Sequence, residues 1–285
     1  MLSKEYLAFR EAFAKLPPPG ELGPDEPPPE GVYLLGGGFP IPEGVTVTKE
    51  ALGGVPVEWS RPAGAPRDKL IIYLHGGGFQ PVPKGLYMDY PFGAILAERS
   101  GLNCVAVDYR MMPENHFPDT VHDAAAAYTA LLEQGMRAED IAVTGESAGG
   151  NLSLSLWLWC RMYGVARPGA IAALSPAVDL SGTEGAIGRP LAPGRDLTAP
   201  LISPRYGDYR GMKRVFVQYG ATDLEAFLVG PGEEMIADMR AQGVDVVYDH
   251  WPELGHAFAA DAGLYPEADE ACARAIAFMK AEIGA

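Results

Sequence analysis

Six short apolar segments alternate with helical patterns along most of this chain, and this alternation limits the possible folds more than any other feature. The apolar segments are residues 70–74, 103–109, 141–144, 171–175, 215–219 and 244–251. Helical periodicity marks residues 90–99, 118–134, 148–162, 232–242 and 267–283. Apolar strands joined by helices are typical of a parallel sheet covered on both faces. The sequence therefore predicts an α/β protein with a mainly parallel central sheet flanked by helices.

Two regions depart from this alternation. The first 16 residues carry apolar side chains near helical spacing, and the prolines that follow end this helix. Residues 17–30 are rich in Pro, Gly and acidic residues and have too little apolar surface to pack alone. Residues 180–203 begin a long excursion with frequent Gly and Pro. We expect an N-terminal segment and linker over residues 1–41 and one main domain over residues 42–285.

Charge and cysteine content exclude several classes of partner. The formal net charge is −15 and the pI is near 4.7, so a nucleic acid or an anionic membrane is not expected to bind. Charged residues interrupt the N-terminal apolar positions, and no later stretch is long enough for a membrane span. Cys104, Cys160 and Cys272 lack metal-ligand spacing, which favours reduced core residues. The expectation is a cytoplasmic protein without a metal or another cofactor.

A Gly-Glu-Ser-Ala-Gly sequence at residues 145–149 follows one predicted strand and opens a predicted helix. Glycines at the first and last positions allow the sharp turn that lifts a serine oxygen above a sheet. A glycine-rich turn with a serine helix cap would give the same letters, but the strand–turn–helix context favours a nucleophile. Ser147 is the candidate nucleophile.

A His-Gly-Gly-Gly-Phe sequence at residues 75–79 comes directly after the strand at residues 70–74. Backbone without side chains can approach a reacting carbonyl closely, so the amides of Gly77, Gly78 and Ala148 are predicted to form an oxyanion hole. A phosphate-binding loop is the alternative, but no Gly-Lys-Ser or Gly-Lys-Thr follows. A similar triplet at residues 36–38 lacks the histidine and is interpreted as a turn.

A serine at its ordinary pKa needs a base within hydrogen-bond reach. His75 belongs to the glycine-rich loop, and His116 and His122 precede the serine, whereas an α/β-hydrolase places its acid and its histidine after it. His250 lies inside an alternating strand, where a structural role is expected. His256 follows the last strand in a loop and is the predicted general base.

Two acidic residues could orient this base. Asp223 follows the strand at residues 215–219 and is the first choice. Glu225 is two residues further along and takes the role if the loop is offset.

Together these motifs resemble the hormone-sensitive-lipase-like branch of the α/β-hydrolases, from about residue 44 to the C-terminus. A third block, Asp-Tyr-Arg-Met-Met-Pro-Glu at residues 108–114, looks like a segment that supports the oxyanion loop in this family. Three departures stand out: Leu224 replaces a proline after the acid, Glu146 stands where Asp or Thr is commoner, and residues 255–258 replace a His-Gly-Phe sequence.

The resemblance implies an α/β-hydrolase fold with a small cap from residues 1–41 and 180–203. It also implies hydrolysis of a small-molecule ester through an acyl-enzyme and, by analogy, a possible homodimer. The thin cap favours short to medium acyl chains. A lactone hydrolase with the same triad and a non-catalytic binding protein on this scaffold are the alternatives.

Overall fold

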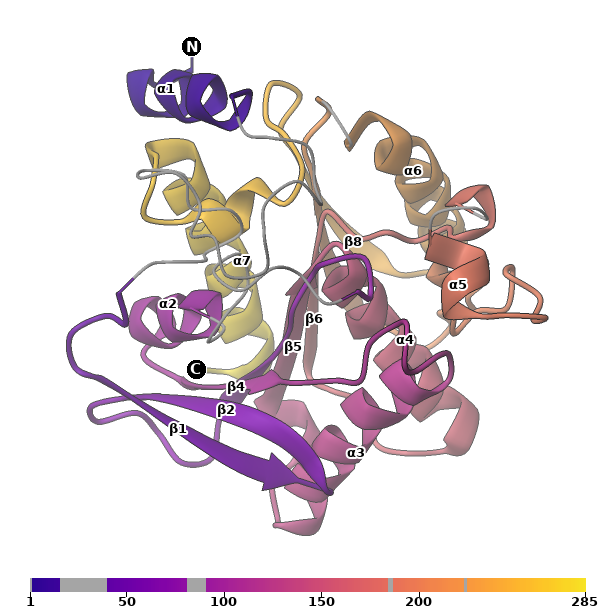
Figure 1. Ribbon diagram of the computed structural model, residues 1–285. Helices are drawn as coiled ribbons and strands as arrows, with labels where there is room; N and C mark the ends of the chain where they lie inside the picture. Colours follow the sequence, from indigo (N-terminus) through magenta and orange to yellow (C-terminus); the bar gives the residue numbers. More distant parts are fainter. Residues whose placement is uncertain (1, 16–39, 81–90, 184–186, 223–224) are drawn as a thin grey trace.

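The structure is a computed structural model, shown in Figure 1, that describes residues 2–15, 40–80, 91–183, 187–222 and 225–285. Within these residues, eight strands form one sheet in the order β1-β2-β4-β3-β5-β6-β7-β8. The strands are β1 (Val45–Leu52), β2 (Val55–Pro62), β3 (Leu70–Leu74), β4 (Asn103–Val107), β5 (Ile141–Glu146), β6 (Ala170–Leu174), β7 (Arg214–Tyr219) and β8 (Asp245–His250). β2 pairs antiparallel with β1 and β4, and the other neighbours pair in parallel. The predicted mainly parallel sheet is confirmed.

Helices cover both faces of the sheet, as Figure 1 shows. They are α1 (Lys4–Phe13), α2 (Pro91–Ser100), α3 (Asp119–Glu133), α4 (Ala148–Tyr163), α6 (Glu225–Ala241) and α7 (Pro266–Ile283). In β3, Ile72 and Leu74 join the core under α3, α4 and α6, whereas Ile71 and Tyr73 join the core under α2 and α7. Because both faces are buried, the central strands are apolar at nearly every position.

Three predicted boundaries were wrong by two residues or more. The strand predicted over residues 141–144 continues to Glu146. The strand predicted over residues 103–109 ends at Val107, because its parallel partner β3 ends at Leu74. The helix predicted to begin at residue 232 begins at Glu225 and continues through Pro231. Proline removes one helical hydrogen bond, but packing of the helix against the sheet outweighs this local preference.

The structure describes part of the N-terminal segment and part of the excursion after β6, the two regions outside the alternation of strands and helices. The N-terminal helix is confirmed as α1, and its Tyr6 is buried beside α7. The linker at residues 17–30 and the glycines at residues 36–38 lie outside the described residues. In the excursion after β6, the described residues include short helical segments, which are the 3-10 helices η2 (Ser181–Thr183) and η4 (Pro204–Tyr206) and the α-helix α5 (Arg189–Leu191).

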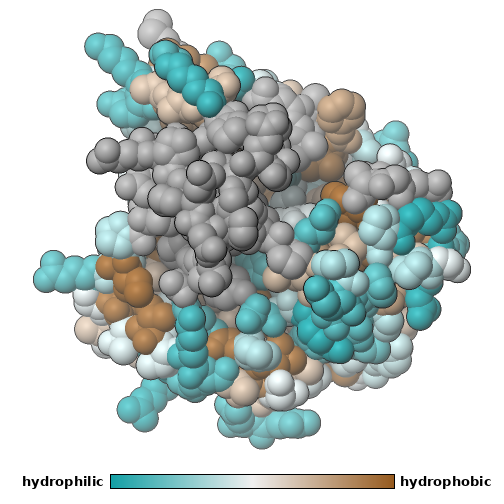
Figure 2. All heavy atoms as spheres, viewed as in Figure 1, coloured by the Kyte–Doolittle hydropathy of each residue, from teal (hydrophilic) through white to brown (hydrophobic). Residues whose placement is uncertain are grey.

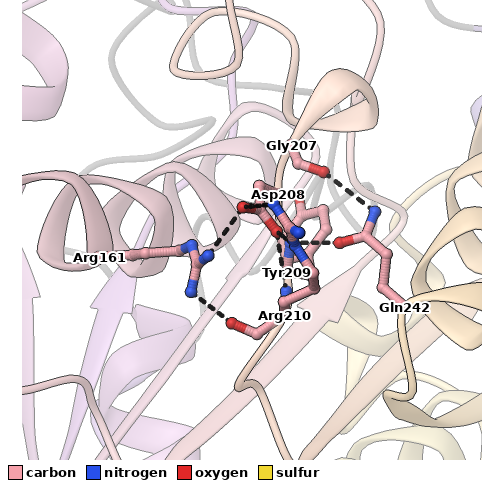
Figure 3. Close-up of polar contacts among 6 residues, drawn as sticks. All are labelled: Arg161, Gly207, Asp208, Tyr209, Arg210 and Gln242. Atoms are coloured by element: carbon pink, nitrogen blue, oxygen red, sulfur yellow. Dashed lines mark hydrogen bonds and ion pairs between the residues drawn. The ribbon is translucent and has the colours of Figure 1, made fainter.

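A polar cluster fixes the chain where it returns from this excursion to β7 (Figure 3). Arg161 of α4 donates to the Asp208 carboxylate at 2.7 Å. Gln242, just after α6, accepts from the Tyr209 amide at 2.6 Å and donates to the Gly207 carbonyl at 3.3 Å. Arg210 and Arg161 hold the pKa of Asp208 well below its ordinary value. The cluster therefore ties the returning segment to two helices on one face of the sheet.

The face shown in Figure 2 carries mainly hydrophilic residues where it is described, and hydrophobic residues form scattered groups. Within the described part of the chain, no helix combines the length and apolar content needed to cross a bilayer.

Two glycines of α6 offer a test of how this helix meets the sheet. A Cβ added at Gly232 would lie 2.4 Å from the Tyr219 ring, which is fully buried and donates its hydroxyl to the Pro176 carbonyl at 2.7 Å. A Cβ added at Gly230 would meet no heavy atom within 4 Å. We expect Gly232→Ala to lower the free energy of unfolding by about 1–3 kcal/mol. Gly230→Ala should leave it unchanged or raise it by up to about 1 kcal/mol. Urea denaturation of both variants measures the difference, and equal stabilities would contradict this packing.

Candidate active site

Ser147 occupies a sharp turn between β5 and α4. Its backbone lies at φ 56° and ψ −114°, a region that costs a non-glycine residue about 1–3 kcal/mol. The turn is held by its own backbone, since the Ser147 amide donates to the Leu174 carbonyl at 2.9 Å. The Ser147 carbonyl accepts from the amides of Asn151 and Ala177 at 3.0 and 3.1 Å. The side chain is partly exposed at the carboxyl ends of the parallel strands, where open α/β sheets bind their ligands.

The glycines beside Ser147 are required by the close approach of β3. A Cβ at Gly149 would lie 1.7 Å from the Leu74 carbonyl oxygen, and one at Gly145 would lie 2.3 Å from the same atom. Neither position can hold a larger residue without moving backbone. The first turn of α4 is therefore pressed against the end of β3, where the glycine-rich loop begins.

The glycine-rich loop turns sharply beside the serine. Gly77 and Gly78 have φ angles of 109° and 63°, and both are partly exposed. Phe79 also has a positive φ, 61°, but is buried, and its carbonyl accepts from the Met112 amide at 2.8 Å. Ala148 is the first residue of α4, so its amide has no acceptor within the helix. The structure thus brings the predicted oxyanion residues to the carboxyl ends of the strands, where Ser147 also lies.

His75 supports this loop and is shielded from solvent. Its ring stacks on Tyr109 at 4.3 Å, and the Tyr109 hydroxyl donates to the His75 carbonyl at 2.6 Å. Burial lowers the pKa of His75 to about 4, so the ring is neutral near pH 7. Next along the chain, the Arg110 guanidinium contacts Asp123 of α3 at 2.8 Å. The predicted supporting role of the Asp-Tyr-Arg block agrees with these contacts.

His256 lies in the loop after β8 and is partly exposed. The next residue, Ala257, donates its amide to the Ser175 hydroxyl at 3.0 Å. Ser175 directly follows Leu174, which accepts from the Ser147 amide. The serine turn and the His256 loop are therefore both bonded to the carboxyl end of β6.

The loop after β7 is fixed against the same histidine loop. The amides of Ala221 and Thr222 donate to the Leu254 carbonyl at 3.0 and 3.2 Å. A Cβ at Gly220 would lie 2.3 Å from that oxygen, so this approach also requires glycine. Asp223 itself lies outside the described residues, and only the backbone of Glu225, the first residue of α6, is described.

The contacts of the remaining histidines differ from those of His75 and His256. His250 is exposed on β8 and stacks on Tyr248 at 5.3 Å. His116 bonds to the Pro190 carbonyl at 2.9 Å, and His122 is exposed on α3. Among the described residues, no three His, Cys, Asp or Glu side chains gather closely enough to hold a metal ion.

One buried acid at the site was assigned no role from the sequence. Glu146 precedes Ser147, is fully buried, and accepts from the Gly76 amide at 2.5 Å and the Tyr73 hydroxyl at 3.0 Å. The only signal in the sequence was a charged residue at the end of an apolar strand. Its partners come from β3 and from the loop after it, so the sequence could not name them.

Comparisons with known proteins agree with this arrangement. A family model described as alpha/beta hydrolase fold matches residues 71–260. An acetyl-hydrolase of Streptomyces hygroscopicus is 29% identical over 267 residues, which cover 87% of this chain and 86% of that protein.

Two solved structures are also similar. A hormone-sensitive lipase from a metagenome library is 31% identical with a TM-score of 0.78, covering 86% of this chain and 87% of that chain. An esterase from the bacterial hormone-sensitive lipase family is 29% identical with a TM-score of 0.85, covering 99% of both chains. This chain therefore belongs to the α/β-hydrolase fold family, in its hormone-sensitive-lipase-like branch.

Proposed function

We propose that this protein is a serine-dependent carboxylic-ester hydrolase, with Ser147 as nucleophile and His256 as general base. One observation carries the proposal: the serine turn and the His256 loop are bonded to the same end of β6, beside the glycine-rich loop. The family relation adds weight, because a relative of similar length is an acetyl-hydrolase and a structural neighbour is an esterase.

In the proposed mechanism, His256 removes the hydroxyl proton of Ser147 as its oxygen attacks the ester carbonyl. The carbonyl oxygen becomes negatively charged and accepts from the amides of Gly77, Gly78 and Ala148. The tetrahedral intermediate then collapses, His256 gives its proton to the leaving alcohol, and an acyl-enzyme remains. Water, deprotonated by His256, attacks this acyl group and releases the carboxylic acid and free Ser147. These steps require no cofactor.

Asp223 is the proposed acid that orients the His256 ring, with Glu225 as the alternative. Thr222, next to Asp223, is bonded to the Leu254 carbonyl, two residues before His256. The described chain is therefore bonded to the histidine loop as far as Thr222, which supports this assignment.

We further propose that residues 1–41 and 180–203 form a small cap over the site of residues 42–285. Ile187 of the excursion reaches within 3.6 Å of the position that a Cβ on Gly78 would take. From α1, the Arg10 guanidinium donates to the Thr222 hydroxyl at 3.2 Å and the Tyr6 hydroxyl to the Glu253 carbonyl at 3.3 Å. Both segments thus contact loops that carry proposed site residues, and a cap this close to the oxyanion loop favours short acyl chains.

The compartment and assembly proposed from the sequence are a cytoplasmic location and a homodimer. Three buried cysteines that form no disulfide suit a reducing compartment. Within the described residues β8 pairs only with β7, so its other side is available to a strand of a second copy.

Replacement of the nucleophile is the first test. Ser147→Ala should reduce turnover of p-nitrophenyl acetate on the order of 10⁴-fold or more, because no attacking oxygen remains. Thermal melting should change little. An organophosphonate should label the wild type once per chain and leave the variant unlabelled. Near-wild-type turnover by a folded Ser147→Ala protein would exclude a serine hydrolase, and an unlabelled, inactive wild type would favour the binding-protein alternative.

Paired substitutions test the base and the acid. His256→Ala should reduce turnover about as strongly as Ser147→Ala, since members of one catalytic unit have non-additive effects. The matched control His250→Ala should retain turnover. For the acid, Asp223→Asn should cost far more turnover than Glu225→Gln. Inactivation by His250→Ala would contradict His256 as the general base. A larger loss of turnover in Glu225→Gln than in Asp223→Asn would assign the acid to Glu225.

A series of p-nitrophenyl esters tests the cap. The ratio kcat/KM should be highest for acyl chains of roughly two to eight carbons. Ile187→Ala should move this optimum to longer chains, because it removes a side chain that lies close to Gly78. Arg189→Ala, exposed on the same excursion, is the control and should not move it. A wild-type maximum at about twelve carbons or more would contradict the proposed cap.

A further inference from the structure

Glu146 connects the glycine-rich loop to the turn that carries Ser147. Its side chain contacts the end of the neighbouring strand, because β5 pairs with β3 from Ile141 to Gly145 and Gly76 lies two residues after β3. One carboxyl oxygen, Oε1, accepts from the Gly76 amide at 2.5 Å. A Cβ on Gly76 would lie 3.0 Å from this oxygen, so the loop backbone rests directly on the carboxyl group.

The two carboxyl oxygens of Glu146 have different surroundings. Oε1 receives a second hydrogen bond from the Tyr73 hydroxyl at 3.0 Å. Oε2 is buried and has no hydrogen-bond partner among the residues that the structure describes. An ionised carboxylate shares its charge over both oxygens and is costly to bury with one of them unbonded. A protonated group with Oε1 as its carbonyl oxygen fits this geometry at lower cost.

We propose that Glu146 is a positioning residue: as a neutral carboxylic acid, it holds the oxyanion loop against the serine turn. The role depends on the proposed ester hydrolysis, because it concerns the oxyanion amides of Gly77 and Gly78. Gly76 directly precedes these residues, so a shift of Gly76 would displace both donors relative to Ser147. A displacement of about 1 Å in such a site can cost on the order of 100-fold in rate.

The neighbouring groups agree with a neutral carboxyl. Burial raises the pKa of Glu146 to about 8, against the lowering effect of the bonds from Gly76, from Tyr73 and from its own backbone. Tyr73 on β3 contacts the apolar Phe92 of α2, and His75 in the loop is kept neutral by burial. A negative charge next to Ser147 would also repel the oxyanion that forms during attack.

The raised pKa has a consequence for stability that is independent of activity. Between the ordinary pKa of 4.5 and the folded value of about 8, the folded chain binds more protons at Glu146 than the unfolded chain. The contribution of Glu146 to stability is therefore fully present below pH 4.5 and is lost as the pH rises through about 8. A glutamine at this position has no proton to lose and removes this dependence.

Three variants test the proposal. Glu146→Gln keeps an oxygen that can accept from the Gly76 amide, whereas Glu146→Ala removes it and leaves that amide buried without its acceptor. Glu98→Gln is the control, because Glu98 is an exposed glutamate on α2. The measurements are kcat and KM for p-nitrophenyl acetate at pH 7, and the melting temperature at pH 5 and pH 8.

We expect Glu146→Ala to reduce kcat about 10- to 100-fold with KM within about threefold. Glu146→Gln should keep kcat within about threefold of the wild type. The melting temperature of Glu146→Gln relative to the wild type should increase between pH 5 and pH 8, and that of Glu98→Gln should not show this increase.

Different results overturn different statements. Wild-type kcat in a folded Glu146→Ala protein would remove the positioning role. If Glu146→Gln is as slow as Glu146→Ala, or gains no stability relative to the wild type between pH 5 and pH 8, the neutral form is wrong. A wild type that neither hydrolyses the ester nor reacts with organophosphonate would instead overturn the proposed hydrolase function, while the melting temperatures would still test the neutral carboxyl.

Discussion

The close approach of the first turn of α4 to the end of β3 is the contact on which the rest of the site depends. The Leu74 carbonyl lies where a Cβ of Gly149 or Gly145 would stand, so only glycine allows the two backbones to meet. This contact forces Ser147 into its positive φ and sets the glycine-rich loop beside it. The cost of the strained turn is offset by backbone hydrogen bonds to Leu174, Ala177 and Asn151. A rigid sheet beneath the turn lets the strain persist.

Parallel topology explains why residues distant in the chain meet at this place. The carboxyl ends of β3, β5, β6 and β7 point the same way. The loop after each strand contacts the neighbouring strand or the loop that follows it. Ser175 is central to this arrangement, because it receives the Ala257 amide and its own amide donates to Gln218 at 2.7 Å. The His256 loop is thus positioned by β6 and β7 rather than by β8, from which it emerges.

Buried polar groups decide how firmly the glycine-rich loop is held. His75 and Tyr109 support the loop from one side, and Glu146 bonds to it from the strand that precedes Ser147. Glu146 and His75 are ionisable, and burial moves their pKa values so that neutral forms are favoured near pH 7. Hydrogen bonds between neutral groups avoid the desolvation cost of a buried charge. The electrostatic field at Ser147 then comes mainly from the backbone amides.

The sequence by itself determined the fold class and the motifs of the site. Apolar strands alternating with helices leave few architectures, and glycines at positions 145 and 149 around a serine have a strong steric reason. It did not locate the start of α6, because packing of this helix against the sheet outweighs the local effect of Pro231. It also left Glu146 without a role, because its partners Gly76 and Tyr73 are about seventy residues away and the pairing of β3 with β5 brings them together. Local residue patterns record which backbone shapes are possible, whereas contacts between strands depend on topology, and these contacts alone decided which buried groups meet.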